Sequence, residues 1–202
     1  DLDGLAEVSL LESERAAQRD FRDERCAHFT GRQAELDAIA AHLEADDSRV
    51  LAVVGEGGSG KSALMAEMTR HITSGLVVYR FIGATPSSTL IDALLRSVVG
   101  ELHEALGMTE AIPTERIELV AFFEELLSHA TQERPITVVL DALDQLTESE
   151  AKTLDWLPID LAPYAKVVVS ALPSLESALY QAETLRVSPM MREEGEALIK
   201  TW

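Results

Sequence analysis

Apolar residues along this chain follow two alternating patterns. Short, mainly apolar runs predict buried β-strands at residues 49–54, 76–82, 136–141 and 166–170, and residues 184–187 suggest a short fifth strand. Between them, apolar residues recur at helical spacing, which predicts helices at residues 7–25, 33–43, 62–68, 90–106 and 113–130, with another beginning at residue 190. Strands of this kind that alternate with helices are typical of a parallel sheet covered on both sides. The pattern predicts an α/β fold with a five-stranded parallel sheet.

The connection between the first predicted strand and the next helix is rich in glycine. It reads Gly55-Glu56-Gly57-Gly58-Ser59-Gly60-Lys61-Ser62, which fits the pattern GxxxxGK[ST]. Glycines let the backbone curl at positive φ, so that successive N–H groups converge on one point. These groups and the positive end of the following helix bind phosphate oxygens. The strand before the motif and the helix after it favour this interpretation over a glycine-rich turn that carries GKS by chance.

The last residues of this loop have separate predicted roles. Lys61 would reach the β- and γ-phosphates of a nucleoside triphosphate, and the Ser62 hydroxyl would ligate Mg²⁺. Lys61 is one of only four lysines, so the match does not come from a lysine-rich composition. We predict that residues 55–62 and the adjoining Ala63 bind the nucleotide.

Two aspartates follow the third predicted strand. Hydrolysis of a bound triphosphate needs an acid that organises Mg²⁺ and a residue that orients water. Asp141 ends the strand, and open α/β sheets bind ligands at the carboxyl ends of their strands. We predict that Asp141 holds Mg²⁺, directly or through water, and that Asp144 polarises the attacking water. The alternative is that both aspartates only cap the next turn.

Charge and composition narrow the partners. The formal net charge of −18 disfavours nonspecific binding to nucleic acid, which needs lysine and arginine to neutralise phosphates. No apolar run approaches the ~20 residues of a membrane helix. The five histidines are scattered without an HxxxH spacing, so no zinc site is expected. Asp1 is preceded by no methionine, the start lacks a signal-peptide pattern, and Cys26 is the only cysteine, so we expect a piece of a longer cytoplasmic protein.

Four segments in order resemble the STAND class of signal-transduction NTPases, near its NACHT ATPases and the telomerase-associated-protein and nephrocystin-3-like branch. They are Phe29–Leu36, similar to the hhGRExEL motif, Gly55–Ser62 as Walker A, Phe81–Ser88 with Leu94–Ser97, and Val138–Gln145 as Walker B. The resemblance implies a P-loop NTPase three-layer sandwich with strand order 5-1-4-3-2. It also implies a preference for adenine, with contacts from Phe29, Thr30, Gly31 and Arg32.

The resemblance further implies a domain plan and a function. Residues 1–30 would form a leading helix and linker, residues 31–189 the NACHT-like P-loop NTPase domain, and residues 190–202 the start of a truncated helical domain. The domain would bind ATP or ADP with Mg²⁺ and act as a signalling switch. ADP would hold a closed monomer, and ATP would permit homo-oligomerisation through flanking domains. Roles in this class include defence and cell-death signalling.

Two positions depart from the family pattern. Gln145 follows Asp144 where relatives usually carry a glutamate, and Leu172 occupies the place of an arginine that senses the γ-phosphate, although Ser170 could still donate one hydrogen bond. A cationic group that stabilises the transition state is worth orders of magnitude in rate. We therefore expect slow intrinsic hydrolysis, or an arginine supplied by a neighbouring subunit. Arg80, Arg116 and Arg134 are candidates, although each is more simply explained as a surface residue.

Two alternatives remain open from sequence. A P-loop kinase or other phosphotransferase would need an acceptor pocket and a mobile basic lid, and the sequence has no arginine-rich lid segment. A nucleotide-binding scaffold with negligible turnover would fit the glutamine and leucine departures.

Overall fold

A single parallel sheet forms the centre of the protein in the computed structural model, which describes residues 2–27, 29–147 and 150–189. Its strands are β1 (Leu51–Val54), β2 (Leu76–Phe81), β3 (Ile136–Asp141), β4 (Ala165–Ala171) and β5 (Glu183–Arg186). Their order across the sheet is β2-β3-β4-β1-β5, and all four neighbouring pairs are parallel. Read from the other edge this is 5-1-4-3-2, which confirms the predicted order.

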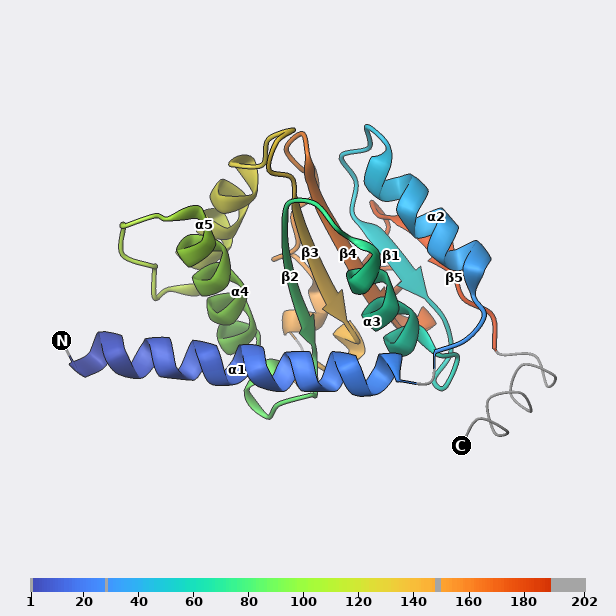
Figure 1. Cartoon of the computed structure of the whole chain (residues 1–202), viewed down its shortest axis with the longest axis horizontal. Coiled ribbons are helices and arrows are strands. Elements are labelled where there is room, and N and C mark those ends of the chain that lie inside the picture. Colours follow the sequence, from blue (N-terminus) through green and yellow to red (C-terminus); the bar gives the residue numbers. More distant parts are fainter. Residues whose placement is uncertain (1, 28, 148–149, 190–202) are drawn as a thin grey trace.

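Helices cover both faces of the sheet (Figure 1). They are α1 (Leu2–Cys26), α2 (Gln33–Glu44), α3 (Lys61–His71), α4 (Ile91–Leu106) and α5 (Arg116–Ser128). Alternate residues of β1 point to opposite faces, as strand geometry requires. Ala52 and Val54 pack with α4 and α5 in one core, and Leu51 and Val53 pack with α2 and α3 in the other. The protein is therefore the predicted three-layer α/β sandwich.

Short 3₁₀ turns follow several strands. They are η1 (Ser87–Thr89), η2 (Leu143–Gln145), η3 (Glu150–Thr153) and η4 (Pro173–Leu175). η2 follows β3 and η4 follows β4, so both lie at the carboxyl edge of the sheet. This edge also carries the glycine-rich loop after β1.

The predicted starts of two helices were wrong. The first helix begins at Leu2 rather than residue 7, because the helical backbone continues through Gly4 toward the N-terminus. The fifth begins at Arg116 rather than residue 113, because Glu115 has extended backbone angles and accepts the first helical hydrogen bond from Leu119. The helix expected from residue 190 lies outside the described residues.

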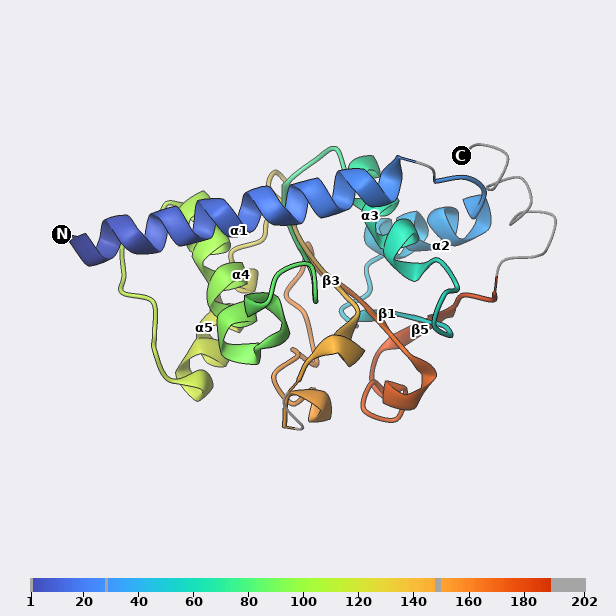
Figure 2. The same cartoon turned by 90° about the horizontal axis from the view of Figure 1, so that it is seen from below.

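α1 is a long helix that crosses the molecule beside edge strand β2 (Figures 1 and 2). Gln18 of α1 is 0% exposed, and its side-chain oxygen accepts a hydrogen bond of 2.6 Å from the Phe81 backbone N–H. Glu14, one turn earlier, accepts bonds from the Thr85 and Ser87 hydroxyls in the loop after β2. Unpaired strand edges can recruit other chains, and Gln18 occupies the backbone groups of this edge at the carboxyl end of β2.

No helix among the described residues combines the length and apolar character needed to cross a membrane.

Candidate functional site

The glycine-rich loop lies at the carboxyl end of β1, which pairs with β4 on one side and β5 on the other. Gly58 and Gly60 have φ angles of 78° and 86°, a region that glycine enters without the steric cost of a side chain. Gly60 is the N-cap of α3, which begins at Lys61. The loop therefore presents its backbone N–H groups next to a helix N-terminus, the arrangement that binds phosphate.

Lys61 is held inside the turn of this loop. It is 9% exposed, and its Nζ donates hydrogen bonds to the carbonyl oxygens of Gly55 at 2.6 Å and Glu56 at 3.0 Å. Both carbonyls belong to the loop itself, so the ammonium group stabilises the closed conformation of the loop. The same flexible side chain is long enough to turn toward a phosphate bound at the N–H groups.

Asp141 ends β3 and is 2% exposed. Ser170 of β4 donates a hydrogen bond of 2.5 Å to its carboxylate, and the Ser170 oxygen accepts one of 2.8 Å from the Ala142 N–H. Burial raises the pKa of Asp141, and hydrogen bonds from Ser170 and Ser62 and the charge of Lys61 oppose that rise. Ser62 therefore lies close enough to Asp141 to affect its carboxylate, which brings the predicted Walker A and Walker B residues together.

A magnesium ion fits this donor set. Mg²⁺ prefers oxygen ligands and is typically held by one or two side chains together with substrate phosphates. The Ser62 hydroxyl and the Lys61 ammonium group lie close enough to the Asp141 carboxylate to affect its pKa. The buried carboxylate, whose desolvation disfavours its charged form, is a group that a divalent cation would stabilise as the anion.

Asp144 lies in η2. This turn begins directly after Ala142, which has a left-handed backbone with a φ of 62°. One carboxylate oxygen accepts a hydrogen bond of 3.2 Å from the Leu172 N–H, and the other accepts one of 3.2 Å from the Gln145 amide. Asp144 thus connects the turns after β3 and β4, and it does not cap η2, whose N-cap residue is Ala142. Its half-buried side chain at the same edge also leaves the predicted role with water open to test.

The three candidate arginines have different positions. Arg80 is 2% exposed and is bound to Ser97 and Glu101 on α4, so it is neither a surface residue nor able to reach another subunit. Arg80 is buried because it lies on the apolar strand β2, and its partners on α4 are too far away in the sequence to be predicted from it. Arg116 pairs with Asp92 at 2.5 Å, and Arg134 is exposed before β3.

The residues expected to contact adenine precede α2. Phe29 packs partly buried against the core on the α2–α3 face, while Thr30 and Gly31 are exposed. Arg32 is turned toward the loop and donates a hydrogen bond of 2.8 Å to the Ser59 carbonyl. The structure therefore brings Arg32 to the phosphate-binding loop, a contact that the sequence pattern alone did not reveal. The adenine contacts themselves stay a prediction.

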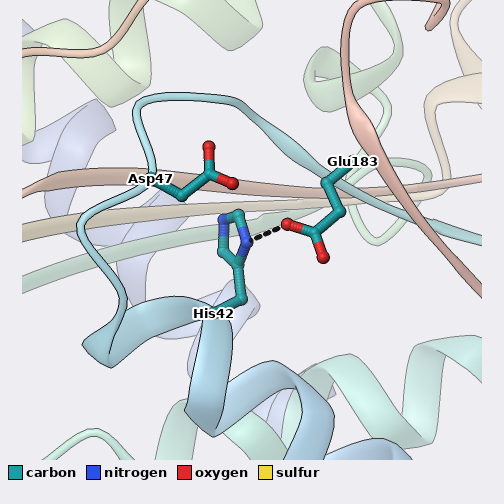
Figure 3. Close-up of side chains that lie close together, drawn as sticks. All are labelled: His42, Asp47 and Glu183. Carbon is teal, nitrogen blue, oxygen red and sulfur yellow. Dashed lines mark hydrogen bonds and ion pairs between the residues drawn. The ribbon is translucent and has the colours of Figure 1, made fainter.

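A second polar cluster lies at the opposite edge of the sheet. His42, Asp47 and Glu183 place possible metal-ligand atoms within 4.8 Å of one another, although their sequence spacing gives no such signal (Figure 3). His42 bonds to Glu183 at 2.8 Å. Arg49 pairs with Asp47 at 2.7 Å and lies 3.6 Å from Glu183. Because Arg49 and His42 already pair with these carboxylates, we interpret the cluster as an ion-paired contact that holds α2 and β5 together.

A cavity of about 810 Å³ also lies at this opposite edge, between α2 and α3. Its lining includes residues that precede the strands, such as Ser48, Ser74 and Pro135. Ligands of open α/β sheets bind at the carboxyl ends of strands. We therefore place the functional site at the glycine-rich loop rather than in this cavity.

Comparison with protein-family models matches residues 28–169 to the AAA ATPase domain. The chain belongs to the AAA ATPase domain family. The matched residues contain the loop, Asp141 and Asp144, so the geometry described above lies in a nucleotide-binding ATPase domain. The family is a P-loop NTPase family, as predicted, and the finer placement in the STAND class remains a proposal.

Relatives of this AAA ATPase domain include much larger proteins. It is 32% identical over 148 residues to mouse NACHT and WD repeat domain-containing protein 2, covering 67% of this chain and 8% of that protein. It is 26% identical over 197 residues to rat telomerase protein component 1, covering 91% of this chain and 7% of that protein. The chain thus spans less than a tenth of either relative.

Solved structures share the fold. One is the structure of Drosophila ORC bound to AT-rich DNA and Cdc6, with a TM-score of 0.54 and 18% identity over 96% of this chain and 64% of that one. Another is the Walker-type ATPase PABY2304 of Pyrococcus abyssi, with a TM-score of 0.50 and 15% identity over 86% of this chain and 57% of that one. At these identities the likeness concerns the fold alone.

Proposed function

We propose that this AAA ATPase domain is an ATP-dependent switch of STAND or NACHT type within a larger protein. The observation that carries the proposal is the meeting of Lys61, Ser62 and Asp141 at the carboxyl edge of the sheet. The loop N–H groups and Lys61 would bind the phosphates, and Ser62 and Asp141 would hold Mg²⁺. The γ-phosphate is the group that differs between the two nucleotide states, so contacts to it supply the free energy that biases the switch.

The proposed turnover is slow. Mg²⁺, when bound, supplies charge stabilisation for the phosphoryl group. Asp144 would polarise water, and Gln145, whose amide donates to Asp144, would help to orient it. Leu172 contributes only its backbone N–H to this region, where an arginine would add a cation. Gln145 and Leu172, the two departures from the family pattern, also support the second candidate, a nucleotide-binding scaffold with negligible turnover.

The remaining parts of the proposal concern the larger protein. We propose that the NTPase domain spans residues 31–189, that residues 1–30 are a leading helix and linker packed on it, and that residues 190–202 begin a truncated helical domain. We also propose that ATP promotes homo-oligomerisation through flanking domains in the cytoplasm. The mouse relative carries NACHT in its name, which supports the switch assignment. The ORC structure contains DNA, but the net charge of −18 here supports a domain that does not bind nucleic acid itself.

Hydrolysis of ATP with Mg²⁺ and no added acceptor tests the proposal. We expect slow phosphate release that Asp141→Asn reduces further, because Asp141 is the predicted Mg²⁺ ligand. ADP retained through purification with turnover at background would instead favour the scaffold. Phosphate transfer that requires an added acceptor would contradict the switch and favour a kinase.

A further inference from the structure

The turn before α2 has an unusual backbone. Gly31 and Arg32 both adopt the left-handed region, with φ angles of 75° and 59°. Glycine enters this region freely, but a long side chain is uncommon there and persists where its surroundings fix it. Arg32 is fixed in this way, since its side chain is only 7% exposed.

The Arg32 guanidinium joins three segments that are far apart in the sequence. Its Nη1 donates to Glu35 on α2 at 2.8 Å. Its Nη2 donates to two backbone carbonyls, those of Ser59 in the phosphate-binding loop and Ser188 after β5, both at 2.8 Å. An Nη atom carries two hydrogens, so these two carbonyls use the donor capacity of Nη2 completely.

The segment after β5 also touches the loop directly. The Val187 N–H donates to the Val54 carbonyl at 2.8 Å, one residue before the loop begins. A Cβ atom added to Gly55 would lie 2.6 Å from the Val187 carbonyl oxygen, so the two backbones are in close contact there. The chain leaving the sheet is therefore packed on one end of the loop and tied to its middle by Arg32.

We propose that Arg32 is a positioning residue that holds the phosphate-binding loop and couples its occupancy to the segment leaving β5. The charge-assisted bond to the Ser59 carbonyl polarises the Ser59–Gly60 peptide, which makes the Gly60 N–H a stronger donor to phosphate. The same guanidinium fixes Ser188, so a change in the loop alters the exit segment. This role rests on the proposed nucleotide binding and differs from the adenine contact implied by the resemblance.

Hydrogen exchange of the parent chain, with and without ADP, measures this coupling. The peptides of interest cover residues 55–62 and 186–189. In the parent we expect ADP to slow exchange in both. In Arg32→Gln we expect faster exchange in both peptides without nucleotide, ADP affinity about tenfold weaker, and no ADP-dependent protection of residues 186–189. Arg32→Lys keeps the charge without the planar fork and should give an intermediate result.

Glu35→Gln is the matched control, because it weakens the Nη1 contact and leaves both carbonyl contacts in place. It should keep the parent's exchange pattern and ADP affinity.

Protection of residues 186–189 by ADP that survives in Arg32→Gln would overturn the proposal. So would exchange that rises equally in all peptides, β3 included, since Arg32 would then serve global stability alone. If Arg32→Gln fails to unfold cooperatively, the lysine variant decides between these outcomes. If the parent does not bind ADP, the proposed function fails, while exchange without nucleotide still tests whether Arg32 ties the two segments together.

Discussion

Among single residues, Ser170 explains how Asp141 at the end of β3 is held against the neighbouring strand β4. Asp141 on β3 and the loop after β1 are separated by β4, which lies between their strands. Ser170 on β4 pairs in register with Val53 and donates to Asp141, so it occupies the gap. From the sequence, Ser170 was expected only to donate one hydrogen bond to the nucleotide, close to Leu172, which replaces the family's arginine. Its bond to Asp141 depends on strand register, which the sequence does not contain.

Asp144→Asn separates water activation from structure. Asparagine keeps an oxygen that can accept the Leu172 N–H, so the turns after β3 and β4 should stay connected. Losing the carboxylate should lower ATP turnover by about 100-fold while leaving ATP affinity unchanged. Steady-state hydrolysis and equilibrium binding measure the two effects, with the exposed Asp155→Asn as control. Unchanged turnover would leave Asp144 only the structural role of linking the turns after β3 and β4.

Burial of Asp141 makes the free energy of unfolding depend on pH. Its pKa is raised in the folded chain, so the protonated form favours folding below the ordinary carboxyl pKa, and this stabilisation is lost as pH rises through the folded-state pKa. Asp141→Asn lacks the titration. The variant should gain stability over the parent as pH rises above about 4, by about 1.4 kcal/mol for each unit of raised pKa. Urea unfolding across pH measures this, and a constant difference would contradict the buried carboxyl.

At the scale of elements, the strands were more predictable than the helix ends. Runs such as Ile136–Asp141 are apolar on both faces because the strands are covered on both sides, and their positions agree with the structure to within about two residues. The strand order came from the family resemblance, because periodicity does not encode neighbours. The start of α1 and its packing on β2 were missed, since a charged helix pattern does not show which edge it covers.

Gln18→Ala tests the role of α1 at that edge. The buried amide makes a bond of 2.6 Å with the Phe81 N–H, and its removal leaves a backbone donor without that partner. We expect the free energy of unfolding to fall by about 1–3 kcal/mol. Gln33→Ala, an exposed glutamine on α2, is the matched control and should change it little. Chemical denaturation measures both, and equal stability of the two variants would argue against α1 as part of the domain.

At the scale of the whole molecule, this ATPase domain is a small part of the proteins that it resembles. The proposal assigns oligomerisation to flanking domains, so residues 1–202 alone should show the same molar mass with ATP as with ADP. Light scattering after size-exclusion chromatography measures this. Assembly of the isolated domain on ATP would move the interface into residues 1–202 and make Arg134, which is exposed, a candidate to act between subunits.

Lys61 is the residue through which we propose that the loop after β1 binds a nucleoside triphosphate. Calorimetric titration of ATP with Mg²⁺ into the parent and into Lys61→Ala tests this proposal most directly. The exposed Lys152→Ala is the matched control. We expect binding by the parent and the control, and an affinity about 10- to 100-fold weaker for Lys61→Ala. Equal ATP affinity in Lys61→Ala and the parent would contradict the proposal.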